Sequence, residues 1–178
     1  MTGSAPSIVG VISDTHDQVH HLVKVIDYFN REQVGLVIHC GDWVSPFTLK
    51  LYTKLHAPLY GVFGNNDGDK FRHLIYAEKY SLKAVFEDQL LVLFKFGKRI
   101  AVYHGDYQEI VNALVKCGDY DVVLHGHNHK AMVEKVGNVV SLNPGTLMDF
   151  TSEKVQGASI GLYNASKHEG RIVWVQDL

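Results

Sequence analysis

The sequence predicts an α/β fold in which two mixed β-sheets pack as a sandwich with helices on the outer faces. Its first half alternates short apolar, β-branched runs with stretches of helical periodicity, as in parallel strands joined by right-handed crossovers. Its second half has closely spaced apolar runs whose connectors are too short for helices, which indicates antiparallel hairpins. The 178 residues, 46% of them hydrophobic, suit a single domain with a substantial core.

The first half predicts three strands and two helices in βαβαβ order. The strands are expected at 8–12, 36–38 and 59–63. The first helix carries apolar residues one turn apart, which are Leu22, Val25, Ile26 and Phe29. The second helix begins at Pro46, since proline suits the first turn, and its apolar positions include Leu49 and Tyr52.

The second half predicts mostly strands. They are expected at 84–87, 90–94, 99–104, 122–124, 132–136, 139–142, 159–163 and 172–175. One helix fits 107–116, and a Gly137-Asn138 turn joins two neighbouring strands. The first three of these strands are expected to form hairpins.

Composition narrows the function classes. A net charge of −2 without a block of basic residues argues against broad binding to nucleic acid or to an anionic membrane. The longest apolar run, 90–94, is too short to cross a bilayer. Cys40 and Cys117 have no CxxC spacing and do not suggest a disulfide framework, which is typical of a reducing compartment. Both are expected to be small buried apolar residues. We therefore expect a cytoplasmic protein with one domain over 1–178, in which 1–6 form a flexible leader.

Polar side chains gather where the predicted strands end. The stretches are SDTHD (13–17), HCGDW (39–43), GNNDGD (64–69), YHGDY (103–107) and HGHNH (125–129). Carboxyl ends of strands form the ligand crevice of open α/β sheets. Asp and Asn after one strand usually make a turn, but carboxylates, amides and imidazoles gathered without counter-cations favour a metal. The residues of each pair Asp14/His16 and His127/His129 are two positions apart, so on an extended chain both side chains point to the same side and can hold one ion.

The order of these motifs resembles that of a known family. DxH (14–16), GD (41–42), GNxD (64–67), HG (104–105) and GHxH (126–129) are similar to the motifs of the calcineurin-like metallophosphoesterases, especially the small, cap-less prokaryotic phosphodiesterases. NPGT at 143–146 is similar to the NPGS element of the small members. Ordered motifs in strand context are much more specific than a single match.

The resemblance implies a ligand set for two divalent transition-metal ions. The first ion would be held by Asp14, His16 and His129, the second by Asn65, His104 and His127, and Asp42 would bridge both. Oxygen and imidazole donors without thiolate suit Mn, which we expect, but also Fe, Ni, Co or Zn.

The expected reaction is hydrolysis of a small phosphodiester, a class that includes nucleotide-like substrates. Two cations about 3.5–4 Å apart lower the pKa of a shared water, so a bridging hydroxide beside Asp42 would attack phosphorus. Many relatives carry histidine at the x of GNxD, where this chain has Asn66, which donates a hydrogen bond but transfers no proton at neutral pH. The candidate catalytic set is therefore Asp42, Asn66 and Asp67, with Asp67 orienting a ligand or Asn66, or simply making a turn.

Three other functions compete with this one. A retromer subunit of the same fold serves as a protein-interaction scaffold, although its metal motifs are partly substituted. A phosphomonoesterase is disfavoured by Asn66, and a nuclease by the absence of a basic stripe for duplex nucleic acid. We expect no membrane partner, and the hairpin face at 84–104 offers a surface for a second copy of the chain.

Residues beside the motifs have simpler expected roles. His39 and His125 are expected as hydrogen-bonded strand residues rather than ligands. Asp17 and Asp106 are expected as helix caps, and Trp43 and Tyr107 as core residues. Asn143 and Thr146 either line the pocket or shape a turn around Pro144.

Overall fold

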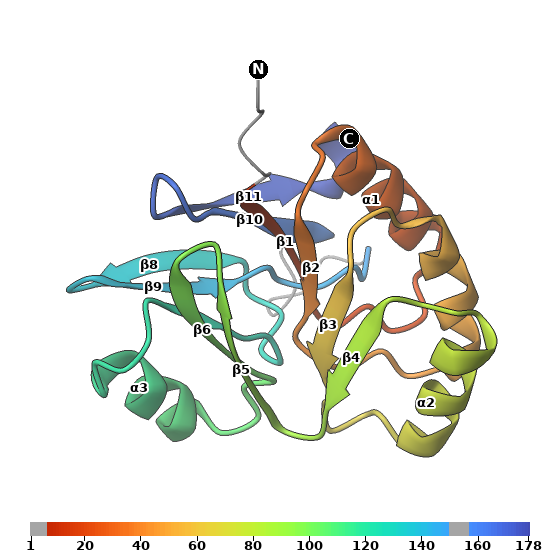
Figure 1. The fold of residues 1–178 in the computed structure, drawn as a ribbon, viewed down its shortest axis with the longest axis horizontal. Helices are drawn as coiled ribbons and strands as arrows, with labels where there is room; N and C mark the ends of the chain where they lie inside the picture. Colours follow the sequence, from red (N-terminus) through yellow and green to blue (C-terminus); the bar gives the residue numbers. More distant parts are fainter. Residues whose placement is uncertain (1–6, 150–156) are drawn as a thin grey trace.

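The structure is a computed structural model that describes residues 7–149 and 157–178. Two β-sheets face each other, and helices cover their outer faces (Figure 1). The strands are β1 (Ile8–Ile12), β2 (Leu36–His39), β3 (Leu59–Val62), β4 (Ala84–Glu87), β5 (Leu90–Lys95), β6 (Lys98–Tyr103), β7 (Val122–Leu124), β8 (Met132–Val136), β9 (Val139–Asn143), β10 (Ser159–Asn164) and β11 (Glu169–Trp174). The helices are α1 (Val19–Arg31), α2 (Lys70–Lys79) and α3 (Gln108–Lys116), with 3-10 helices η1 (Pro46–Lys54) and η2 (Val175–Asp177).

Both sheets mix parallel and antiparallel pairs, which confirms the predicted fold class. The first sheet has the order β11-β10-β1-β2-β3-β4, in which β1 to β4 run parallel. The second has the order β5-β6-β7-β9-β8, with β6, β7 and β9 parallel and the edge strands antiparallel. The parallel strands of both sheets point their carboxyl ends toward one region, and this is where the polar loops converge.

The core has three parts because each sheet face needs its own apolar cover. One cluster fills the space between the sheets, with Val11, Ile38, Val102 and Leu124 among its members. A second lies between the first sheet and α1, η1 and α2, and it includes the four predicted apolar residues of α1. A third lies under α3.

The predicted strand at 84–87 is present, but the prediction was wrong about its pairing and missed the helix that precedes it. Strand β4 does not form a hairpin with β5, because it pairs parallel to β3 after a crossover through α2. Helix α2 was missed although Phe71, Leu74 and Ile75 have helical spacing; in the structure these three are exposed, and the buried positions of the helix are His73 and Ala77. The helix at Pro46 is present but has 3-10 geometry.

Smaller corrections concern exposure and capping. Cys40 is buried as expected, whereas Cys117 is exposed at the end of α3. Tyr107 is 62% exposed rather than packed in the core. The N-cap positions of α1 and α3 make no side-chain cap hydrogen bond, so Asp17 and Asp106 do not cap these helices. The predicted leader at 1–6 lies outside the described residues.

In the part of the chain that the structure describes, no helix combines the length and the apolar composition needed to cross a bilayer.

Candidate metal centre and active site

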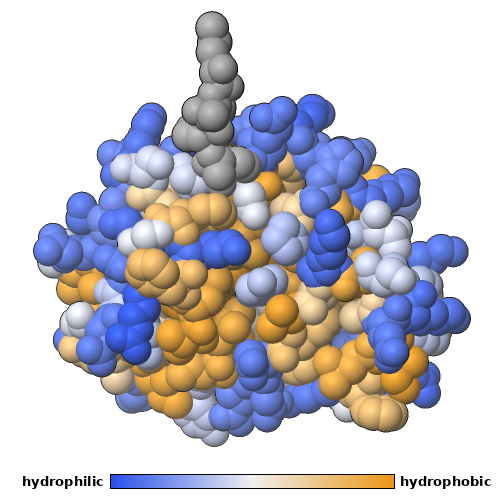
Figure 2. All heavy atoms as spheres, in the orientation of Figure 1, coloured by the Kyte–Doolittle hydropathy of each residue, from blue (hydrophilic) through white to orange (hydrophobic). Residues whose placement is uncertain are grey.

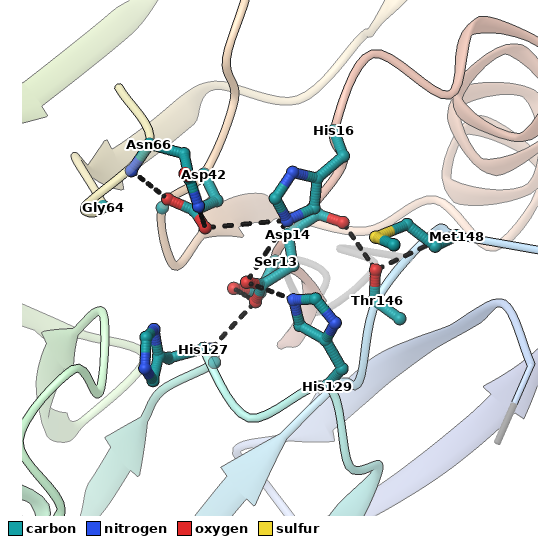
Figure 3. A network of polar contacts seen from close by, with 12 residues as sticks. Ser13, Asp14, His16, Asp42, Gly64, Asn66, His127, His129, Thr146 and Met148 are labelled. Atoms are coloured by element: carbon teal, nitrogen blue, oxygen red, sulfur yellow. Dashed lines mark hydrogen bonds and ion pairs between the residues drawn. The ribbon is translucent and has the colours of Figure 1, made fainter. Parts of the chain in front are cut away.

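The loops that follow β1, β2, β3, β6 and β7 bring all the predicted ligands together. Asp14 and His16 follow β1, Asp42 follows β2, and the remaining ligands follow β3, β6 and β7. Figure 3 shows Asp14 between His16 and His129, with Asp42 and Asn66 on two neighbouring loops, which follow β2 and β3. Residues more than a hundred positions apart therefore share one site.

The first group of ligand atoms surrounds Asp14. Its Oδ1 lies 3.1 Å from Nε2 of His129 and 3.8 Å from Nε2 of His16. Among the described residues, Asp14 Oδ1 and His16 Nε2 are buried without a hydrogen-bond partner. Buried polar atoms are costly when unpaired, and a cation placed among these atoms would remove that cost.

The second group surrounds Asn65. Its Oδ1 lies 2.9 Å from Nε2 of His104 and 3.0 Å from Nδ1 of His127, and these two nitrogens are 3.2 Å apart. Nδ1 of His104 lies 2.9 Å from the backbone oxygen of Cys40, so this nitrogen carries the proton of the neutral ring and Nε2 presents a lone pair. The lone pair of His104 Nε2 thus faces the acceptor Oδ1 of Asn65, an arrangement that suits a bound cation.

Asp42 connects the two groups. Its Oδ1 lies 3.5 Å from Nε2 of His104, and its Oδ2 lies 3.6 Å from Nε2 of His16. Each carboxylate oxygen therefore faces a different group, which is the position expected of a bridging ligand.

The ligand loops adopt backbone conformations that are uncommon for residues with side chains. Positive φ angles occur at Asp14, His16, Asp42, His127 and His129. Such angles cost free energy and are found where the surrounding structure holds them for a functional purpose. Here the backbone N–H of His127 donates to Oδ2 of Asp14 at 2.9 Å, and that of Asp14 donates to the oxygen of Gly41 at 2.9 Å.

Two glycines allow these loops to approach one another. A Cβ added to Gly126 would collide with Ser13 Oγ and Asp14 Oδ2, and one added to Gly64 would collide with Asp42 Oδ1. The glycines of the GHxH and GNxD motifs are therefore needed for close packing against the carboxylates.

Asp67 braces the loop that carries Asp42. Its Oδ2 accepts hydrogen bonds from the backbone N–H groups of Asp42 (3.0 Å) and Gly64 (2.7 Å), while Oδ1 accepts from Val44 at 2.8 Å. Burial raises the pKa of the Asp67 carboxyl, and the bonds from Gly64 and Val44 oppose that rise. The side chain is 4% exposed and acts through Asp42, so it does more than make a turn.

Asn66 contacts the Asp42 carboxylate directly. Its side-chain Nδ2 donates to Asp42 Oδ2 at 2.7 Å, and its backbone N–H donates to Oδ1 at 2.9 Å. Asn66 itself is exposed, so its amide lies at the boundary between the candidate bridging ligand and solvent.

Asn143 and Thr146 shape the turn around Pro144, one of the two roles that the sequence left open, because Asn143 Oδ1 accepts from the backbone N–H of Gly145 at 2.9 Å and Thr146 Oγ1 from that of Met148 at 3.1 Å. Both side chains also hold neighbouring loops. Nδ2 of Asn143 donates to the oxygen of Gly126 at 3.0 Å and to Asn128 Oδ1 at 2.9 Å, which holds the loop of the two ligand histidines. Oγ1 of Thr146 donates to the backbone oxygen of Asp14 at 2.7 Å. Both side chains are fully buried.

The comparisons with known proteins agree with this arrangement. The family model of the calcineurin-like phosphoesterase superfamily domain matches residues 8–166. A phosphodiesterase from Methanocaldococcus jannaschii is 33% identical over 163 residues, which are 92% of this chain and 96% of that protein. A probable metallophosphoesterase from Methanothermobacter thermautotrophicus is 32% identical over 148 residues, 78% of this chain and 76% of its own length. The chain belongs to the calcineurin-like phosphoesterase superfamily.

Solved structures show the same fold. A structure described as a novel archaeal phosphodiesterase superposes with a TM-score of 0.85 at 32% identity, covering 93% of this chain and 98% of its own. Vacuolar protein sorting 29 from Cryptosporidium parvum superposes with a TM-score of 0.63 at 18% identity over 96% of this chain and 97% of its own, a likeness of fold alone. The resemblance predicted from the motifs is thus confirmed for the superfamily.

The donor set of this superfamily member fits metal ions. Among the acidic and imidazole side chains that the structure describes, two sets of three have ligand atoms that all lie within 4.8 Å of one another. One set is Asp14, His16 and His129, and the other, which links the two candidate ion positions, is Asp14, Asp42 and His104. Burial raises the pKa of Asp14, but the imidazoles of His129 and His104 and the hydroxyl of Ser13 outweigh it, so the carboxyl stays below its ordinary pKa. Asp14 in turn raises the pKa of His129. The carboxylate is therefore already in the charged form that coordination requires.

Two residues of this site were missed from the sequence, although both lie inside the SDTHD stretch at 13–17. Ser13 donates to Asp14 Oδ2, which leaves Oδ1 for the candidate ion. Thr15 donates to the backbone oxygen of Asp42 at 3.4 Å and contacts His39 Nε2 at 3.1 Å. Their position next to the ligands Asp14 and His16 was the only signal, since Ser and Thr are common in turns.

His39 and His125 are held in hydrogen bonds, as predicted. Nδ1 of His39 accepts from the backbone N–H of Gly41 at 3.1 Å, and its ring stacks on Trp43 with centroids 3.5 Å apart. Nε2 of His125 contacts Ser141 Oγ at 3.2 Å. Burial lowers the pKa of His39 well below its usual value and that of His125 to about 4, so both rings are neutral near pH 7.

Proposed function

We propose that this protein is a phosphodiesterase that hydrolyses small phosphodiesters at a centre of two divalent metal ions. The observation that carries the proposal is the position of Asp42, whose two carboxylate oxygens face the two groups of candidate ligands. In the first group, Asp14 Oδ1 and His16 Nε2 are buried without a hydrogen-bond partner among the described residues. The 33% identity with the phosphodiesterase of M. jannaschii over nearly the whole chain supports the same activity.

The protein side chains define what the centre would hold. Asp14, His16 and His129 would bind one ion, Asn65, His104 and His127 the other, and Asp42 both. Two bound metal ions would lower the pKa of a water molecule, and their positive charge would stabilise the phosphoryl oxygens. Oxygen and imidazole donors suit manganese, which we propose for this centre in a cytoplasmic protein.

Asn66 sets the class of ester in this proposal. Its amide already donates to Asp42 Oδ2 and is exposed, so it is placed to donate to a substrate oxygen that approaches Asp42. An amide cannot protonate a leaving alkoxide at neutral pH. Diesters with good leaving groups should therefore react faster than phosphomonoesters.

The proposal is tested by measuring Mn²⁺ binding by calorimetry together with hydrolysis of a panel of cyclic nucleotides and aryl diesters. We expect about two Mn²⁺ per chain in the wild type, and loss of both binding and turnover in Asp42→Ala. His20→Ala, a change at an exposed position of α1, is the matched control and should behave as wild type. Absence of Mn²⁺ binding would refute the metal centre, while binding without turnover on any diester would favour the scaffold function.

Asn66→His tests the role of Asn66. A proton donor at this position should raise the ratio of monoesterase to diesterase activity by about tenfold or more, since general acid catalysis typically contributes at least that much. The ratio is measured with aryl mono- and diesters that share a leaving group. An unchanged or lower ratio would contradict the account of ester preference.

A further inference from the structure

Strand β5 forms one edge of the second sheet. Within the described residues it pairs only with β6, in antiparallel register, so its other side presents backbone N–H and C=O groups without a neighbouring strand. Natural edge strands are usually protected by a proline, a bulge or an inward charge. Residues 90–94 contain no proline and no charged side chain, and their pairing with β6 is not interrupted by a bulge. The first charged residue of the strand is Lys95, at its end.

The same strand exposes an apolar row on its outer face. Leu90 is 44% exposed, Val92 42% and Phe94 74%, whereas the alternating Leu91 is buried between the sheets. Helix α3 covers the outer face of β6 and β7, where Ala101, Tyr103 and Val123 are buried, but β5 is not part of that cluster. Figure 2 shows a broad hydrophobic area where Figure 1 places the β5–β6 hairpin.

The sequence of β5 is compatible with its own copy. In an antiparallel pair with a two-fold axis through Val92, directly opposite residues share a sheet face. Val92 then faces Val92 of the second copy, Leu90 faces Phe94, and Leu91 faces Leu93. Apolar residues therefore meet apolar residues on both faces. Lys95 faces Gln89, so the pairing brings no like charges together.

We propose that the protein forms a symmetric dimer in which β5 of one copy adds to β5 of another and continues the second sheet across the two-fold axis. The pairing satisfies the edge hydrogen bonds and brings the outer row Leu90, Val92 and Phe94 against the same row of the second copy, which removes part of its apolar surface from water. It requires no contribution from the candidate metal centre, so this proposal and the proposed function stand or fall separately.

The first test compares three proteins by light scattering after gel filtration over a range of concentrations. The wild type should have the mass of a dimer, and Val92→Lys, which places two charges at the axis, should shift to the mass of a monomer. Phe71→Lys is the matched control, since Phe71 is 73% exposed in the separate apolar stripe of α2, and it should remain a dimer. A monomeric wild type, or a monomer caused by Phe71→Lys but not by Val92→Lys, would overturn the proposal.

The second test fixes the register. Cys117 is exposed, so the experiment uses a Cys117→Ser background in which Val92→Cys is added. Opposite positions of an antiparallel pair have Cβ atoms about 4.5–5.5 Å apart, close enough for oxidation to give a covalent dimer after a small backbone adjustment. Gel electrophoresis without reductant should show that dimer, and Phe71→Cys in the same background should give none. Failure of Val92→Cys to cross-link at concentrations where a dimer is present would refute this strand pairing.

Discussion

Asp67→Asn tests whether the hydrogen bonds behind the ligand loop are needed for the metal centre. The carboxylate accepts three backbone N–H groups, two at Oδ2 and one at Oδ1. Asparagine has one oxygen, which can keep the pair from Asp42 and Gly64. Its NH₂ group then faces the N–H of Val44, so one donor loses its acceptor and meets another donor.

The magnitude follows from the lost bond. A hydrogen bond to a charged group contributes about 1.5–3 kcal/mol, so Asp67→Asn should lower the free energy of unfolding by about 2–3 kcal/mol. A domain with ordinary stability of about 5–15 kcal/mol would remain folded after this change. Loss of support behind a ligand typically weakens metal binding by about 10–100-fold, and Mn²⁺ affinity should fall within that range.

The assay combines urea unfolding of the metal-free protein with calorimetric titration of Mn²⁺. Asp69→Asn is the matched control, because Asp69 is an exposed carboxylate at the N-cap of α2 that accepts from the N–H of Arg72. Asn caps helices as well as Asp does, so this variant should show wild-type values. The reasoning is refuted if Asp67→Asn also has wild-type stability and wild-type Mn²⁺ affinity.

Two further predictions follow from the packing and from burial. Gly126→Ala should abolish Mn²⁺ binding and lower the melting temperature, because its Cβ would collide with Ser13 and Asp14, whereas Gly68→Ala has open space and should match the wild type in both measurements. His39 has a folded-state pKa well below the ordinary value of about 6.5. Its unfolded form therefore binds more protons as pH falls below about 6.5, and the metal-free protein should lose about 2 kcal/mol between about pH 7 and pH 5 from this residue. Urea unfolding of His39→Asn should show a correspondingly smaller loss, and an equal loss would contradict the assignment.

The sequence by itself determined the fold class and the order of most elements. Short β-branched runs and the helical spacing of Leu22, Val25, Ile26 and Phe29 depend on local geometry, which a single sequence records directly. The positions of the polar residues were also visible, because ligands must follow strands whose carboxyl ends meet at one edge. These strand ends marked a polar cluster, and the resemblance of its motifs to a known family then named the candidate ligands before their distances were known.

Only the tertiary structure decided which partners complete these elements. The place of β4 beside β3 depends on the crossover through α2, which packs on the sheet through His73 and Ala77 while its apolar residues at helical spacing remain exposed. Asp67 accepts hydrogen bonds from the backbone N–H groups of Asp42 and Val44, and Asn143 donates to Gly126 in the histidine loop, so these bonds join segments that are well separated in the chain. Periodicity describes how one segment repeats, whereas these contacts arise from the packing of several segments. The ligand types were therefore set by the sequence, and their spacing and support were set by the fold.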